Sequence, residues 1–357
     1  MYKKGLSFAV KRDALNTILN NHIGQVKPKM DSTLSLTPAT DSIFNDSESL
    51  YSIIQSNCFD WLAKQEPNSI HAVVTDPPYG LKEYTEVEKS KLRAGRGGIW
   101  RMPPVLDGCK RMPLPRFTVL NEHDKVALQE FFRQWSILIF RVLVPGAHVF
   151  IATNPLVSHS VYVPMIEAGF EKRGEICRLV QTLRGGDRPK NAHEEFPDVT
   201  VIPRACWEPW GLFRKPCEGR VQDNLRKWKT GGLRRISDEQ PFCDVINSSP
   251  TRGIERKIAP HPSLKPQAFM RQIVRAALPM DEGIIIDPFM GAGSTIAAAC
   301  AIGYKSIGIE IDPEFFSMAS KAIPLLATLD TGRHKARSFF TYNEEQQRLE
   351  DLTNSLI

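Results

Sequence analysis

Asp76, Pro77, Pro78 and Tyr79 are the residues of this sequence whose types and spacing most clearly suggest chemistry. They follow an apolar, β-branched run that predicts a buried strand, and two consecutive prolines cannot continue one. Open α/β sheets bind ligands at the carboxyl ends of their strands. A carboxylate, backbone carbonyls free of strand pairing and an aromatic ring at that place could grip the exocyclic amine of a planar base. A strand followed by an ordinary polar turn is the alternative, and the rarity of Asp-Pro-Pro-Tyr favours a catalytic site.

A second candidate site follows the apolar run at 284–286, which predicts another buried strand. The turn after it contains Gly291 and Gly293, where a ligand can approach the backbone without meeting a Cβ atom. An alanine-rich helix and a further strand follow, and that strand ends at Glu310, 17 residues beyond Gly293 (310 − 293). A carboxylate at about this spacing holds ribose hydroxyls in nucleoside-binding α/β units. Helix packing alone could also explain an isolated Gly-x-Gly, but the strand–turn–helix context favours a cofactor site.

These segments resemble those of the amino-methylating DNA methyltransferases that use S-adenosylmethionine. The run 76–79 resembles the catalytic motif of that family, and 287–293 resembles its cofactor motif. The segment 261–266, His-Pro-Ser-Leu-Lys-Pro, resembles the one that precedes the cofactor motif. The catalytic motif begins 211 residues before the cofactor motif (287 − 76), which is the permuted order of the β subgroup. One departure is Ser56-Asn57, where the family often has Gly-Asp.

The resemblance implies a fold and a cofactor. The implied fold is a Rossmann-like α/β domain with a seven-stranded, mostly parallel sheet, helices on both faces, and the strands before Asp76 and Asp287 side by side. Glu310 would hold the ribose of S-adenosylmethionine, Phe289 would lie beside the cofactor, and Lys265 and Ser294 would meet its methionine carboxylate. The expected cofactor-binding residues are Asn57, Lys265, Asp287, Phe289, Gly291, Gly293, Ser294 and Glu310.

The expected activity is methylation of the N6 amine of an adenine flipped out of duplex DNA. Aspartate at the first motif position usually accompanies adenine in the resembling family, so N4-cytosine methylation is the alternative. An inactive DNA-binding regulator on the same fold is the rival from another class. A nicotinamide-dependent oxidoreductase is disfavoured because Ile296 stands where its Gly-x-Gly-x-x-Gly motif needs glycine.

The net charge of +6 is modestly basic, as phosphate binding would favour. The insertion at 81–120 contains nine Lys or Arg against four acids, and the segment 215–260 carries further basic clusters around a tryptophan. We expect 215–260 to be the target-recognition segment. The residues expected to contact DNA are Arg96, Arg101, Arg226, Lys227, Trp228, Arg234 and Arg235.

The remaining expectations concern organisation and partners. An N-terminal extension (1–47), a catalytic half (48–214), the recognition segment, a cofactor half (261–327) and a tail (328–357) are expected, with strands at 175–181 and 198–203 and a hairpin completed by 210–214. Seven scattered cysteines without a Cys-x-x-Cys pair indicate neither a metal site nor disulfides. No apolar run reaches the ~20 residues of a membrane span. We expect a cytoplasmic, nucleoid-associated bacterial or phage protein that binds double-stranded DNA, with a homodimer and a cognate restriction endonuclease as further candidate partners.

Overall fold

The computed structural model describes residues 50–78, 120–180, 188–189 and 191–331, together with the backbone of three short strands, β1 (Ser42–Asn45), β4 (Val105–Leu106) and β5 (Cys109–Lys110). Tyr79, Arg96 and Arg101 lie outside the described residues, as do most of the predicted N-terminal extension, insertion and tail. Within the described part of the chain, no helix is long and apolar enough to span a bilayer.

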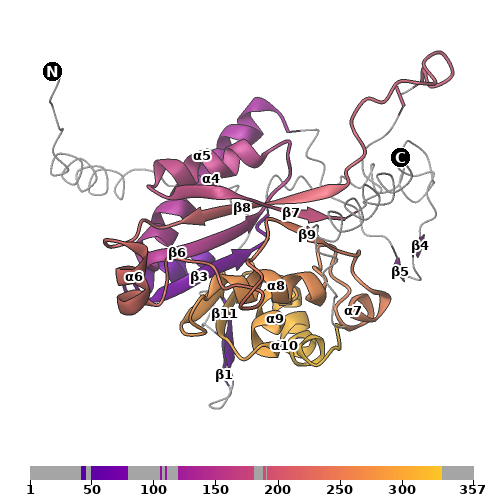
Figure 1. Cartoon of the computed structure of the whole chain (residues 1–357). Coiled ribbons are helices and arrows are strands. Elements are labelled where there is room, and N and C mark those ends of the chain that lie inside the picture. Colours follow the sequence, from indigo (N-terminus) through magenta and orange to yellow (C-terminus); the bar gives the residue numbers. More distant parts are fainter. Residues whose placement is uncertain are drawn as a thin grey trace, which may run out of the picture. The chain divides into compact units, whose positions relative to one another are not determined.

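A nine-stranded sheet, in the order β1-β2-β11-β10-β3-β6-β8-β7-β9, forms the centre of the described residues (Figure 1). From β2 to β6 neighbouring strands are parallel, whereas β8 is antiparallel to both β6 and β7. The expected seven-stranded, mostly parallel sheet is therefore confirmed, from β2 to β7 in this order, and β1 and β9 extend it at the two sides. Their bounds are β2 (Tyr51–Gln55), β3 (Ile70–Thr75), β6 (Leu143–Ala152), β7 (Glu171–Leu179), β8 (Trp207–Arg214), β9 (Val245–Asn247), β10 (Ile284–Asp287) and β11 (Lys305–Glu310).

The strand predicted at 198–203 is wrong. These residues form turns and bends, and β8 begins only at Trp207, which pairs with Leu179 at the end of β7. The apolar side chains of the segment remain exposed, with Val201 at 62%. Among the described residues, β7 ends at Leu179 and no strand pairs with this segment, and alternating hydrophobicity alone does not make a strand.

Helices cover both faces of the sheet (Figure 1). β3 is buried on both sides, because Val73 packs into one hydrophobic cluster while Ala72 and Val74 pack into another. The described helices are α2 (Cys58–Lys64), α4 (Glu122–Val142), α5 (Ser158–Glu167), α6 (Val221–Trp228), α7 (Gly253–Ile258), α8 (Gln267–Ala277), α9 (Ser294–Ala301) and α10 (Pro313–Ala327).

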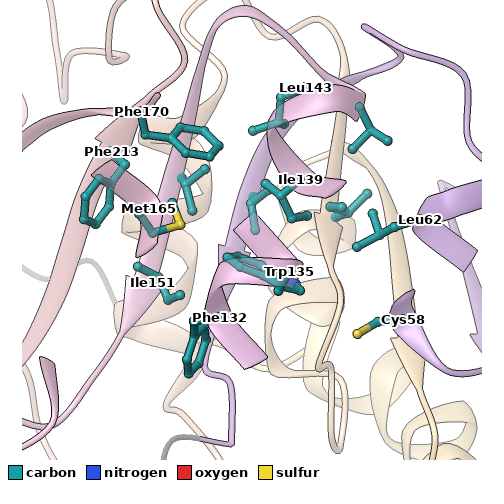
Figure 2. Close-up of a cluster of buried hydrophobic side chains, with 14 of the residues drawn as sticks. Cys58, Leu62, Phe132, Trp135, Ile139, Leu143, Ile151, Met165, Phe170 and Phe213 are labelled. Atoms are coloured by element: carbon teal, nitrogen blue, oxygen red, sulfur yellow. The ribbon is translucent and has the colours of Figure 1, made fainter. Parts of the chain in front are cut away.

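The sequence of α4 explains how one face is covered. Asn121 and Asp124 form a capping box at its start, and the buried positions Phe132, Trp135 and Ile139 recur at helical spacing. These side chains pack between the sheet and the helices α2 and α5 (Figure 2). At about 1.5–3 kcal/mol for each large apolar side chain, this burial fixes α4 beside the central strands.

Candidate active site

The catalytic and cofactor motifs meet at one edge of the sheet. We call the edge where β2, β11, β10, β3 and β6 end the carboxyl edge, and the opposite one the amino edge. Thr75, the last residue of β3, donates a hydrogen bond of 2.7 Å to Asp287 at the end of the neighbouring β10. Burial raises the pKa of Asp287 to about 6, while hydrogen bonds from Thr295 and Thr75 oppose the rise. The predicted adjacency of these two strands is confirmed.

Asp76 follows β3 directly at the carboxyl edge. Its side chain is 16% exposed, and its Oδ2 accepts from the ammonium of Lys265. Its Oδ1 is buried and has no hydrogen-bond partner among the described residues. Burial raises the pKa of Asp76, and the Lys265 ammonium opposes that rise. The site therefore presents one carboxylate oxygen with unused acceptor capacity, followed by the buried Pro77 and the exposed Pro78.

Two further charges extend the Asp76–Lys265 pair, and sequence reasoning did not find them. The Lys265 Nζ lies 3.2 Å from Oε1 of Glu208, near the start of β8. The other Glu208 oxygen lies 2.5 Å from Nη1 of Arg178, near the end of β7. Arg178 also donates to Ser248 and lies over the ring of Phe269. The only signal in the sequence was an acid inside the mostly apolar run of β8. We call Asp76, Lys265, Glu208 and Arg178 the charge quartet.

Gly291 and Gly293 of the cofactor turn are constrained in different ways. Gly291 has a φ of +52° and donates its N–H to Oε2 of Glu310 at 2.8 Å. Gly293 has a φ of +82°, and a Cβ there would lie 2.5 Å from Cγ1 of Ile323 in α10. Close packing of α10 is therefore a reason for glycine at position 293 that the sequence did not indicate, and the approach of a ligand to this turn stays a prediction.

Glu310 ends β11 in the half-buried position expected for a ribose contact. Each carboxylate oxygen accepts one backbone N–H, from Gly291 and from Asp312, which leaves acceptor capacity on both. Burial raises the pKa of Glu310, and these backbone hydrogen bonds oppose the rise. Ile311, which follows directly, is apolar yet 65% exposed. Sequence reasoning missed Ile311, which offers an uncovered apolar surface beside the carboxylate.

Asn57 follows Ser56, whose backbone is bonded to that of Glu310. Its side chain caps α2 by accepting from the Phe59 N–H at 2.9 Å, and the Ser56 N–H donates to the Glu310 carbonyl at 3.0 Å. Phe289 is half buried, with ring centroids 5.9 Å from Trp135, so it belongs to the core beneath the site as well as to its surface.

The two residues predicted to meet the methionine carboxylate lie together. The backbone N–H of Lys265 donates to Oγ of Ser294 at 3.3 Å. The Lys265 ammonium, however, is directed at Asp76 and Glu208. Taken with Glu310, Ile311 and Phe289, these groups fit a nucleoside cofactor, because they combine ribose acceptors with apolar surface at one sheet edge. Among the described residues, no three His, Cys, Asp or Glu side chains gather as metal ligands would.

The predicted DNA contacts on α6 lie at the amino edge, away from Asp76. Asn224 of α6 donates to the Pro145 carbonyl in the first part of β6, whereas Asp76 is level with Ala152 at its end. Seven residues of strand separate these levels, or roughly 23 Å. Figure 1 shows α6 at one end of the sheet and β9 and α7 toward the other. In addition, Arg226 pairs with Asp223 at 2.9 Å, and Lys227 and Trp228 both donate to Glu218.

Arg234 and Arg235 also lie at the amino edge. Arg234 pairs with Asp281 and donates to the Tyr304 hydroxyl at 2.7 Å, in the segments that lead into β10 and β11. Arg235 is exposed, and its carbonyl accepts from Arg275 at 2.5 Å. These five residues therefore lie at the edge away from Asp76, and their contact with DNA stays a prediction. Because β8 is antiparallel to β6, the chain leaves β8 at the amino edge.

Comparisons with known proteins find DNA methyltransferases similar to this chain over most of its length. Residues 70–321 match the family model of the N6/N4 DNA methylases. The Type II methyltransferase M.HindIII of Haemophilus influenzae is 26% identical over 290 residues, covering 75% of this chain and 93% of the relative. The Type II methyltransferase M2.DpnII of Streptococcus pneumoniae is 23% identical over 273 residues, covering 76% and 88%.

Among solved structures, the cytosine-N4-specific PvuII DNA methyltransferase has the same fold, with a TM-score of 0.51 at 14% identity over 80% of this chain and 90% of that one. The TTHA0409 protein of Thermus thermophilus, a putative DNA modification methylase solved with S-adenosyl-L-methionine, has a TM-score of 0.48 at 20% identity, with coverage of 76% and 94%. The family model spans most of the chain, including the Asp76 and Asp287 motifs. The chain belongs to the N6/N4 DNA methylase family.

Proposed function

We propose that this protein transfers a methyl group from S-adenosylmethionine to the N6 amine of an adenine flipped out of duplex DNA. The observation that carries the proposal is the Asp76 carboxylate, which keeps one buried oxygen unused and directly follows Thr75, whose hydroxyl donates to Asp287 at the start of the Gly-rich turn before α9. A carboxylate acceptor next to a nucleoside-cofactor turn suits methylation of an amine, and membership of the family supplies the reaction class.

Asp76 and the Pro77 carbonyl accept the two amine hydrogens in this proposal. The amine is a poor nucleophile because its lone pair is delocalised into the ring. Two acceptors on one side draw the nitrogen toward tetrahedral geometry and localise that lone pair, so preorganised acceptors supply the rate enhancement. Tyr79, which lies outside the described residues, stacks on the base in this proposal.

Bound S-adenosylmethionine supplies the electrophilic methyl group. Glu310 would accept hydrogen bonds from the ribose hydroxyls, while Ile311 and Phe289 would provide apolar contact for the nucleoside and Asn57 would add a polar group near it. The Gly291 turn would hold the methionine part of the cofactor, and Ser294 would contact its carboxylate. We assign Lys265 to Asp76 rather than to the cofactor, because its ammonium lies on that carboxylate.

The DNA surface belongs at the carboxyl edge in this proposal, since the base must be flipped into a pocket there at a cost of a few kcal/mol. The chain enters its basic insertion directly after the catalytic motif, so Arg96 and Arg101 remain the proposed phosphate contacts. The type II relatives motivate two further proposals, a cognate restriction endonuclease and a bacterial cytoplasmic location. Self-association into a homodimer is proposed from the sequence alone.

The target base is tested by mass spectrometry of nucleosides. DNA without prior methylation is incubated with the protein and S-adenosylmethionine, then digested, with Asp76→Asn as the matched control. We expect N6-methyladenine from the wild type and none from the control. N4-methylcytosine alone would overturn the adenine assignment but not the enzyme class. Neither product, on DNA of mixed sequence, would overturn the proposed function.

A further inference from the structure

The charge quartet is buried to a degree that calls for an explanation. The side chains of Arg178, Lys265, Asp76 and Glu208 are 6%, 10%, 16% and 17% exposed. The four residues come from β7, the segment before α8, the segment after β3, and β8. Their charges alternate and sum to zero. Desolvating four charges is costly, and apolar side chains of similar volume often stabilise such a position equally well. Stability alone is therefore a weak reason for the arrangement.

We propose that Glu208 is a positioning residue for Asp76, acting through the ammonium of Lys265, which it shares with that carboxylate. The proposal rests on the proposed function of Asp76 as the acceptor for the target amine. It assigns one carboxylate oxygen, Oδ2, to Lys265 and leaves the other, Oδ1, to the substrate.

Asp76 must be ionised to accept a hydrogen bond from the amine at either oxygen. Only the ionised carboxylate is a pure acceptor, and burial favours the protonated form. An ammonium in contact with Oδ2 opposes that effect, so Lys265 favours the charged form of Asp76. The charged groups that face Asp76 are Lys265, Glu208, Arg178 and, from β10, Asp287.

Glu208 also restrains the position of the Lys265 ammonium. An ammonium with Asp76 as its sole anion would concentrate its donors on that carboxylate and compete with the incoming amine. Glu208 lies 3.2 Å from the Lys265 Nζ and draws part of its hydrogen bonding away. Arg178 holds Glu208 in turn at 2.5 Å, and Ser248 fixes Arg178 at 3.0 Å. The shared ammonium is thereby held at a set place beside Asp76.

The sheet provides a matched control. Arg178 pairs with Glu208 across the β7–β8 ladder, and Glu171 pairs with Arg214 across the other end of the same ladder. Glu171→Gln removes an acid from an equivalent Arg–Glu pair at the amino edge. It should leave the pH dependence of methylation unchanged.

The experiment measures kcat/KM for DNA against pH in the wild type, Lys265→Met, Glu208→Gln and Glu171→Gln. In the profile of kcat/KM against pH, we expect the acid limb of the Lys265→Met variant to move to higher pH by about one to three units, because Asp76 loses an adjacent opposite charge. We expect the limb of Glu208→Gln to move to lower pH, because a like charge is lost. If Lys265 and Glu208 had only a structural role, their substitution would change stability or overall activity. It would not move the acid limbs of the two pH profiles in opposite directions.

Limbs that stay at the wild-type position, or that move in the same direction, would overturn the proposal. If Lys265→Met does not fold, Lys265→Arg and Glu208→Gln still decide: the first keeps the cation and should keep the wild-type limb. Full activity of Asp76→Asn would instead overturn the role of Asp76 itself. The failure of this inference and the failure of the proposed function are thus distinguishable.

Discussion

The two ends of the β7–β8 ladder carry the same kind of ion pair in different surroundings. At the amino edge, Arg214 of β8 pairs with Glu171 of β7 at 2.6 Å, and Glu171 is 39% exposed. At the carboxyl edge the order is reversed, with Arg178 on β7 and Glu208 on β8, and both are largely buried. Only the second pair continues, through Lys265, to a further buried carboxylate.

The comparison separates a structural pair from one that serves a site. The Glu171 carboxylate remains partly hydrated, so its pair resembles surface ion pairs, which contribute about 0–1 kcal/mol. Glu208 is desolvated and has two cationic partners, so removing either one changes the charge balance around Asp76. The same cross-strand contact therefore has a different consequence at each edge of the sheet.

The largest expected effect comes from Asp76 itself. Asp76→Asn should lower kcat on the order of 10³-fold, because the amine loses a charged acceptor, while cofactor binding stays near the wild-type value. Incorporation of a labelled methyl group and calorimetric titration with S-adenosylmethionine measure the two properties. Glu310→Ala should instead weaken cofactor binding. Glu171→Gln should change neither kcat nor cofactor binding. Loss of cofactor binding in Asp76→Asn would contradict this division of labour.

The next largest expected effect is on stability and differs between Arg178 and Arg214. Arg178→Met leaves Glu208 buried with only Lys265, and we expect the free energy of unfolding to fall by about 3 kcal/mol. Arg214→Met leaves Glu171 partly hydrated, so we expect a loss of about 1 kcal/mol. Urea unfolding of both variants measures the difference. Equal losses would show that burial does not distinguish the two pairs.

The parts of the site that follow local sequence rules could be predicted. β3 is an apolar run ended by prolines, and β10 and β11 end at Asp287 and Glu310, so their carboxyl ends could be placed from strand patterns alone. The adjacency of β3 and β10, implied by the family resemblance, is confirmed by the pairing of Ile286 with Val73. Local rules suffice here because Asp287 and Glu310 end their strands and Asp76 directly follows β3.

The quartet could not be predicted, because it depends on register and strand direction. Arg178 and Glu208 are 30 residues apart and meet only through the pairing of β7 with β8. The direction of β8 also decides at which edge the chain emerges, which is why the predicted recognition segment begins at the amino edge. Gly293 is a third case, since its packing partner Ile323 lies on a helix 30 residues later (323 − 293).

A smaller expected effect is the pH dependence of stability that His148 causes near the amino edge. His148 of β6 pairs with Arg214 in register, and burial lowers its pKa to about 3. In the unfolded chain His148 binds a proton near pH 6.5, whereas in the folded chain it stays neutral until about pH 3. The stability that depends on neutral His148 is therefore fully present above pH 6.5 and is lost as pH falls toward 3. The loss reaches at most about 1.4 kcal/mol per pH unit. Thermal unfolding of His148→Gln should therefore depend less steeply on acid than that of the wild type, and parallel curves would contradict the assignment.

The smallest expected effect concerns the two arginines at the amino edge that sequence reasoning assigned to DNA. Arg234 is paired with Asp281, and Arg235 is exposed at the edge away from Asp76. Each phosphate contact adds roughly 0.9 to the slope of log affinity against log salt. If the duplex lies over the carboxyl edge, Arg234→Ala with Arg235→Ala should leave that slope unchanged, whereas Arg96→Ala with Arg101→Ala should lower it by nearly two. Fluorescence anisotropy with a labelled duplex at several salt concentrations measures both. A reduced slope in the first double variant would place DNA at the amino edge as well. The two edges would then differ in catalysis but not in DNA binding.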